Sequence, residues 1–477
     1  MVRKTASNAS LPTENSGLRS VPRTVRRHRR YAWFDLLIAL CAAGGLTASA
    51  LYKVQIATST FAASDFKTLY ASVWCFVHGL DAYSIPNLQR VFVSNGVIQP
   101  EKWYAHAPVY PPTTLALLSP MAALGMVHAA YVLTILSGVL LAVAITALMR
   151  YAADNYDLGP VWRIAIAGLC ACGPLLTFGV DMGNVSLAVS ALCFVAFVWR
   201  KQTPFGISRG SPWLPAAALA VAFMLKPHLG LWAGVAMLLL PERAARAVAV
   251  RAVGLVAGFA LLSTAAMAAM GTLALETHSC LAMLSTETSA GSSMNVSSRE
   301  ALPVVAQITS LGSIVGFWVT NPAIRVTLTG IALLALGFLA VRQTRRVDTE
   351  RGALLAVGMW CTLGMLATYH RAHDAVLLIA VVPWVVDRIR RAPLAWHAWA
   401  AATLYCAMSV SVDFPVVARW VSTASRYSLE AFVLLRQVGL ADLLLLVVLL
   451  LAMVHERTRQ LARITHSVES DQISIAA

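Results

Sequence analysis

The sequence predicts an all-α integral membrane protein that crosses the bilayer many times. The chain has 477 residues, of which 58% are hydrophobic and only 12% are charged, and its mean hydropathy is +0.69. Soluble globular proteins carry about 25% charged residues, so this chain has too little polar surface to form a water-soluble globule. Long stretches of Ala, Leu and Val recur, and in lipid such stretches form helices that satisfy their own backbone hydrogen bonds. The short alternating segments of a membrane barrel are absent.

Basic residues at the ends of the apolar segments predict the topology. The formal net charge is +15, which in a soluble chain would indicate a nucleic-acid partner. Here the Arg residues flank apolar segments, as cytoplasmic loops do, so no nucleic-acid partner is expected. The basic clusters lie at 200–201, 243–251, 342–351, 388–391 and 457–463. If all are cytoplasmic, the outer loops are 54–112, 272–322, 370–374 and 412–436.

The chain divides into a long membrane region and two polar tails. We expect a disordered, basic cytoplasmic tail at 1–31, a membrane domain at 32–455 and a second cytoplasmic tail at 456–477. The first apolar segment, 34–53, is too long for a cleaved signal and is predicted to be a retained helix. The other apolar segments are 113–149, 162–179, 184–199, 213–226, 228–241, 247–271, 323–341, 352–369, 374–387, 395–411 and 437–454. They predict about 12 crossings by the criterion of about 20 residues each.

Two segments call for particular interpretations. The stretch 66–78 is amphipathic and aromatic, which predicts a helix at the membrane interface. Segment 113–149 is interrupted at Ser119-Pro120 and Gly125. Two crossings there would place the basic C-terminus outside, so we predict one full crossing plus a short or broken helix.

The eight cysteines do not indicate a disulfide framework or a metal site. Most lie inside apolar segments, where Cys behaves as a small hydrophobic residue. No C-x-x-C pair occurs. Cys75 and Cys280 both fall in predicted outer loops, so a bridge between them remains open.

Polar residues collect at the outer ends of the predicted helices. They are Asp65, Asp181 with Asn184, the run Lys226-Pro227-His228, and the run 369–374. Ionisable groups at membrane depth are costly and usually functional, so their common side predicts a cavity open to the outside.

Each group also has a structural interpretation. Asp65 could cap a helix starting at Phe66, Asn184 could stabilise a turn, and Lys226 could extend to the interface. The group His370, Arg371, His373 and Asp374 is the hardest to explain structurally. A zinc site there lacks an evident third ligand, so no metal is expected.

A cavity with one carboxylate and several cations suits sugar transfer from a lipid phosphate. A general base must take the proton of the acceptor hydroxyl, and Asp65 fits that role. Cations must stabilise the phosphate leaving group. Four residues fit this second role: Lys226, His370, Arg371 and His373.

The order of several short motifs resembles that of a known family. The motifs are Ser64-Asp65-Phe66, Gly79-Leu80-Asp81-Ala82-Tyr83, Tyr110-Pro111-Pro112, Pro120, Gly183-Asn184, Lys226-Pro227, Tyr369-His370-Arg371 and His373-Asp374. In this order they resemble glycosyltransferase family 87, polytopic GT-C-type enzymes that use polyprenyl-phosphate sugars. Its members include mycobacterial mannosyltransferases and arabinofuranosyltransferases. The resemblance covers roughly residues 30–455, and the chain departs from it with Asn184 where the family often has Gln.

The resemblance implies an inverting transfer on the outer face of a bacterial plasma membrane, with Asp65 as the base. It implies a polyprenyl-phosphate sugar donor, a glycan, glycolipid or protein acceptor, and no cofactor. The expected substrate-contacting residues are Lys67, Asp81, Tyr83, Tyr110, Asn184, Asn295, Arg299 and Asp374.

Two other classes of protein remain open. A transporter or flippase for an anionic lipid-linked substrate would use the same cations, but transporters usually place substrate contacts near the midplane within repeated halves. A scaffold protein would leave the charges at membrane depth unexplained.

Overall fold

The protein is all-helical in the computed structural model, which describes residues 32–55, 64–97, 109–171, 183–201, 211–288, 308–368, 370–409 and 439–458. Among these residues the exceptions are two short strands, β1 (Ile308–Thr309) and β2 (His370–Arg371), which pair antiparallel. The predicted all-α class is confirmed. The predicted tail 1–31, and the second tail beyond residue 458, lie outside the described residues.

Five of the described helices are long and apolar enough to cross a membrane. They are α2 (Ala32–Gln55), α7 (Met126–Tyr156), α13 (Arg243–Ala269), α17 (Pro322–Thr344) and a C-terminal helix, Gly439–Thr458. Four apolar helices are shorter than the roughly 20 residues that a crossing needs: α8 (Pro160–Ala171), α10 (Ser186–Trp199), α11 (Trp213–Leu225) and α12 (Pro227–Leu239). The chain is therefore a polytopic membrane protein, and the count of about 12 crossings stays a prediction.

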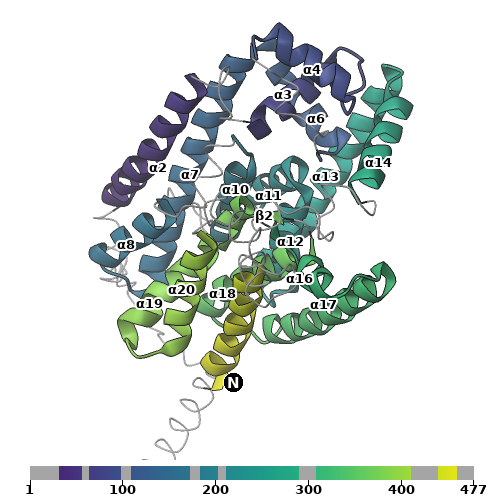
Figure 1. The fold of residues 1–477 in the computed structure, drawn as a ribbon. Helices are drawn as coiled ribbons and strands as arrows, with labels where there is room; N and C mark the ends of the chain where they lie inside the picture. The colour runs from purple at the N-terminus through teal and green to yellow at the C-terminus, as the bar shows by residue number, and fades with distance from the viewer. Residues whose placement is uncertain are drawn as a thin grey trace, which may run out of the picture.

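The other described helices are shorter or less apolar, and four of them pack together at one end of the bundle. They are α3 (Ser64–Val77), α4 (Ile85–Ser94), α6 (Pro112–Leu118), η1 (Ser119–Ala123), α14 (Leu273–Thr288), α16 (Leu311–Trp318), α18 (Glu350–Ala367), η2 (Ala372–Val381), α19 (Val382–Arg391) and α20 (Trp396–Ser409). α3 packs against α4, α6 and η1, and these helices lie together at the top of Figure 1. The expected short helix before one long crossing is present as α6 and η1 before α7, because Pro120 falls where the α-helix ends.

Ion pairs join the predicted cytoplasmic basic clusters to one another. Arg200, at the end of α10, donates from Nε to Oε2 of Glu242 at 2.9 Å and from Nη2 to Oε2 of Glu350 at 2.5 Å. Arg388 of α19 lies 3.5 Å from Glu456 near the end of the C-terminal helix. These contacts bring the ends of several helices to one side of the bundle, as the positive-inside pattern requires.

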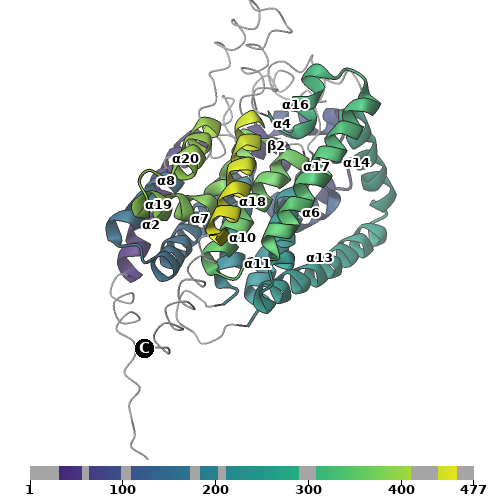
Figure 2. The same cartoon turned by 90° about the horizontal axis from the view of Figure 1, so that it is seen from below.

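Helices α11 and α12 form a tight hairpin near the middle of Figure 1, and Figure 2 shows α11 between α10 and α13. A Cβ atom at Gly230 would lie 2.5 Å from Cα of Phe223, so only glycine allows this approach. Lys226 lies at the tip with φ −150° and ψ 87°, which interrupts the helix. Because the next residue is Pro227, the α conformation is disfavoured at Lys226. The sequence thus places a lysine where the chain must turn.

A second close approach joins α2 to α7, and it gives a testable prediction. A Cβ atom at Gly138 would lie 2.0 Å from Oγ1 of Thr47. Ala normally stabilises a helix by about 1 kcal/mol relative to Gly, but here we expect Gly138→Ala to destabilise the protein by about 1–3 kcal/mol through overpacking. Thermal unfolding in detergent, followed by tryptophan fluorescence, measures the change.

The matched control adds Thr47→Ala, which removes the clashing hydroxyl. We expect the double variant to regain most of the lost stability. An equal loss with and without Thr47→Ala would show that the helix contact is not the cause.

Candidate active site

Four separate segments bring polar side chains together between the helices. Nδ2 of Asn184 donates to Oδ2 of Asp65 at 2.7 Å. Nζ of Lys226 donates to Oδ1 of Asn184 at 3.2 Å, to Oγ of Ser186 at 2.7 Å and to Oδ1 of Asp374 at 2.5 Å. Asn184 therefore links the carboxylate of Asp65 to the cation of Lys226.

Asn184 owes its position to a turn before α10. Its Oδ1 accepts from the backbone N–H of Ser186 at 2.9 Å, which is the side-chain-to-backbone turn that Asn favours. Gly183 precedes it with φ +63°, a left-handed conformation that Gly adopts without strain. The amide is fixed on its own backbone, so its Nδ2 atom points to Asp65 in the first turn of α3.

The ion pair between Lys226 and Asp374 is buried. The two residues are 7% and 2% exposed. Burying charges is costly unless they are paired and further hydrogen-bonded. The three N–H groups of Lys226 meet three acceptors, and Ser186 Oγ also donates to Asp374. His228 extends the group, with Nε2 lying 3.9 Å from Oδ2 of Asp374.

The short helices place this cluster below those ends of the long helices that lie away from the Arg200–Glu242 pair. At 1.5 Å per residue, the 13 or 14 residues of α10, α11 and α12 span about 20 Å, against about 30 Å of hydrocarbon. α10 and α12 both end beside the Arg200–Glu242 pair. Their opposite ends, which carry Asn184 and Lys226, are therefore recessed relative to the longer α7 and α13.

The structure brings together four predicted site residues: Asp65, Asn184, Lys226 and Asp374. For three others it describes the backbone alone: His370 and Arg371 form β2, and His373 lies in η2. This backbone directly precedes Asp374. Asn295 and Arg299 lie outside the described residues.

The other predicted substrate contacts form a separate group around α3, α4 and α14. Asp81 accepts from the backbone N–H of Tyr83 and from Oγ of Ser279, both at 2.9 Å. The hydroxyl of Tyr83 donates to the carbonyl of Tyr110 at 2.6 Å. Lys67 is buried, and burial lowers its pKa to about 8. In this structure these contacts stabilise the outer helices, and substrate contact by these residues stays a prediction.

Glu276 of α14 gives a pH-dependent prediction for this outer region. The residue is fully buried, and burial together with nearby Asp81 raises its pKa from 4.5 to about 7. The folded state therefore favours the neutral acid, and stability falls as pH rises from about 4.5 to about 7. We expect Glu276→Gln to stabilise the packing of α14 by about 2–3 kcal/mol above pH 7 and to have little effect near pH 4.5.

Amide hydrogen exchange along α14 at pH 5 and pH 8 measures this effect. In the unsubstituted protein exchange should accelerate at pH 8 beyond its intrinsic pH dependence, and in the variant it should not. Identical protection factors for both proteins at pH 8 would contradict the assignment.

Ser186 was not predicted as a site residue, and His228 was noted only within the run Lys226-Pro227-His228, without a role. Each stands two positions after a predicted one, Asn184 or Lys226, and that spacing was the available signal. Among the described residues, no group of three His, Cys, Asp or Glu side chains could hold a metal ion. Cys75 and Cys280, the pair left open for a bridge, are both free thiols.

The fold and site define a polytopic helical membrane protein with a carboxylate and a paired lysine in a recess between helices. Residues 109–368, more than half of the chain, match the model of glycosyltransferase family 87. The chain belongs to this family and is a membrane glycosyltransferase. The match includes Asn184 and Lys226, whereas Asp65 and Asp374 lie on either side of it. No curated protein and no solved structure matches the chain.

Proposed function

We propose that this protein transfers a sugar from a polyprenyl-phosphate donor to a hydroxyl group of a glycan, glycolipid or protein on the outer face of a bacterial plasma membrane. The observation that carries the proposal is the shared contact of Asn184 with Asp65 and Lys226. One amide sets the spacing between a candidate base and a candidate phosphate-binding cation. Transfer from a sugar phosphate requires both groups, on opposite sides of the reacting carbon.

The proposed reaction is a single displacement. The acceptor hydroxyl oxygen attacks the anomeric carbon while Asp65 takes its proton. The bond from the anomeric carbon to the phosphate oxygen breaks, and its electron pair leaves with the polyprenyl phosphate. Lys226 exchanges one of its three side-chain acceptors for a phosphate oxygen and stabilises the charge that develops there, with His370, Arg371 and His373 as further proposed contacts. Attack opposite the leaving group inverts the anomeric configuration.

Asp374 and Ser186 act as positioning residues in this proposal. Both bind Nζ of Lys226, so they fix the ammonium group before the donor arrives. Preorganised charges of this kind stabilise a transition state without further rearrangement. The recessed position of the cluster also suits a donor whose phosphate is held near the bilayer by its own lipid chain.

The test is transfer by the purified protein in lipid nanodiscs. A panel of labelled polyprenyl-phosphate sugars is mixed with extracted envelope glycolipids and glycans, and the products are analysed by mass spectrometry. We expect a new glycoside and free polyprenyl phosphate in equal amounts. Movement of an intact lipid-linked sugar across proteoliposomes, without a covalent product, would favour the flippase alternative.

A further inference from the structure

Basic side chains on the predicted cytoplasmic side of the bundle fall into two groups. In one group a carboxylate neutralises the charge: Arg200 pairs with two glutamates, and Arg390 and Arg391 share the carboxylate of Asp387. The other group consists of exposed arginines that have no hydrogen-bond or ion-pair partner on their side chains among the described residues. This arginine cluster is made up of Arg342, Arg345, Arg346 and Arg457.

The arginine cluster is assembled from two helices that are far apart in the chain. Arg342 belongs to the last turn of α17, and Arg345 and Arg346 directly follow that helix. Arg457 lies near the end of the C-terminal helix, and one end of α17 approaches this yellow helix in both Figures 1 and 2. Desolvation and the neighbouring charges of Arg457 and Arg342 lower the pKa of Arg346. The fold thus concentrates positive charge at this point, and such a concentration attracts an anion.

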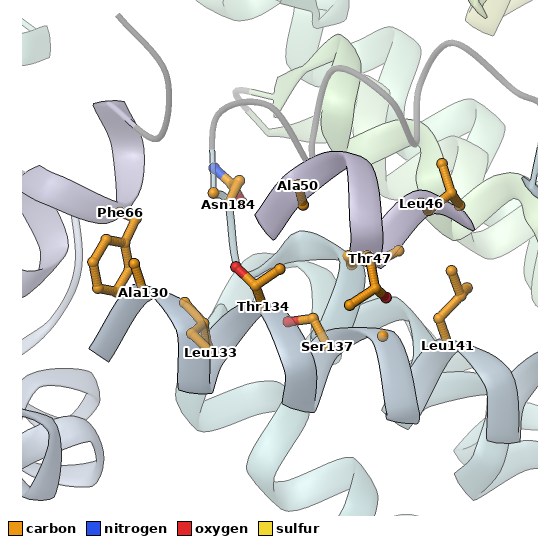
Figure 3. Close-up of a pocket in the computed structure, with 13 residues that line it drawn as sticks. Leu46, Thr47, Ala50, Phe66, Ala130, Leu133, Thr134, Ser137, Leu141 and Asn184 are labelled. Carbon is orange, nitrogen blue, oxygen red and sulfur yellow. The ribbon is translucent and has the colours of Figure 1, made fainter. Parts of the chain in front are cut away.

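α17 lies almost entirely outside the packed bundle. In its most apolar 18-residue stretch 6% of the residues are buried, against 61% for α7, and Figure 3 shows Thr47 of α2 among the side chains of α7. On α17, by contrast, Leu334 and Phe338 are 76% and 68% exposed. Spaced four residues apart, they lie on the same face of the helix as Arg342. This face therefore continues from a cationic end into an apolar surface.

We propose that the arginine cluster binds the headgroup of an anionic phospholipid from the cytoplasmic leaflet, with an acyl chain along the apolar face of α17. This lipid is neither the donor nor the acceptor of the proposed reaction. Charge complementarity selects an anionic headgroup over a zwitterionic one, as at other basic clusters beside the cytoplasmic ends of spanning helices. The apolar face selects a lipid over a free phosphate ion, which would make no contact with it.

The proposed lipid joins two helices whose ends repel each other. Its phosphate accepts hydrogen bonds from guanidinium groups of both helices, and these charge-assisted bonds are stronger than neutral ones. We therefore expect the lipid to stabilise the position of α17, which has few buried residues of its own.

The test is native mass spectrometry of the purified protein in micelles that contain equal amounts of phosphatidylglycerol and phosphatidylcholine with the same acyl chains. We expect the unsubstituted protein to retain phosphatidylglycerol in preference to phosphatidylcholine. Replacement of both Arg346 and Arg457 by Gln should reduce the retained phosphatidylglycerol by about tenfold or more. Phosphatidylglycerol should also raise the melting temperature of the unsubstituted protein more than that of this variant.

The matched control is the double variant Arg243→Gln with Arg246→Gln. Both arginines are exposed at the start of α13, on the same predicted side of the membrane. Their replacement removes the same charge as the cluster variant but leaves the arginine cluster intact. The control should therefore retain phosphatidylglycerol as the unsubstituted protein does. Because all four substituted side chains are exposed, we expect both variants to fold, and tryptophan-fluorescence melting checks this.

Three outcomes would overturn the proposal. The first is equal retention of the two lipids by the unsubstituted protein. The second is a loss in the cluster variant no greater than that in the control. The third is displacement of phosphatidylglycerol by inorganic phosphate but not by chloride of the same ionic strength, which would indicate a site for free phosphate. None of these measurements involves sugar transfer, so the proposed function is tested separately.

Discussion

Replacement of Asp65 by Asn should reduce sugar transfer by about 10²–10⁴-fold, the usual contribution of a general base. The amide of Asn has nearly the shape of the carboxylate but cannot take the proton of the acceptor hydroxyl. The amide oxygen of the new Asn can still accept the hydrogen bond that Nδ2 of Asn184 donates to Asp65 at 2.7 Å. We therefore expect normal expression and an unchanged melting temperature. The loss should appear mainly in kcat, with little change in KM for the donor.

Asp81→Asn is the matched control. Asp81 also belongs to the outer region, but its contacts are to Tyr83 and Ser279 rather than to the cluster around Lys226. Its substitution should reduce transfer far less than Asp65→Asn does. Undiminished transfer by a well-expressed Asp65→Asn variant would remove Asp65 from the proposed role.

The second large effect concerns the buried ion pair. Lys226→Met should destabilise the protein by about 3–5 kcal/mol, because it leaves the carboxylate of Asp374 buried without its cation. The double variant Lys226→Met with Asp374→Leu removes both charges and should regain most of that stability. It should nevertheless fail to transfer sugar, because no ammonium group remains to stabilise the phosphate. Melting temperature and transfer rate, measured on the same samples, separate the two effects.

A second buried ion pair, outside the site, serves as the control for Lys226 and Asp374. Arg163 of α8 and Asp35 of α2 are equally buried, and Nη1 of Arg163 lies 2.7 Å from Oδ1 of Asp35. Arg163→Met should also be destabilising, and its combination with Asp35→Leu should recover stability. This second double variant should retain transfer. If both double variants transfer sugar equally well, Lys226 has a structural role alone.

The chemistry of the site was easier to predict than its geometry. Lys226 and Asp374 could be found from the sequence because ionisable residues are scarce in apolar segments and costly at depth. Asp65 was found from its place in the first predicted outer loop and from the motif Ser64-Asp65-Phe66. Ser186 could not be found, since a serine inside an apolar helix carries no comparable cost and its role depends on which lysine it meets. Only the fold brings Lys226 to Asp374, 148 positions away in the chain.

The limits of the fold prediction have equally specific causes. Hydropathy found the positions of the helices but does not show how far each one extends through the bilayer. The segments 213–226 and 228–241 form the 13-residue α11 and α12, and a crossing by each of them stays a prediction. The segment 374–387 was predicted as one helix. It is a 3₁₀ stretch, η2, followed by α19, with Pro383 in the first turn of α19. An apolar run does not distinguish these geometries.

The short hairpin has a consequence for the choice of membrane. α12 ends beside the pair of Arg200 and Glu242, so the height of Lys226 is fixed by about 20 Å of helix measured from that pair. The headgroup of a lipid substrate instead takes its height from the thickness of the surrounding bilayer. Lys226 and the headgroup therefore lie at the same height only in a bilayer of one particular thickness. If the donor is lipid-linked as proposed, we expect transfer to be fastest in a bilayer of one thickness and slower in thicker or thinner ones, without a change in any residue.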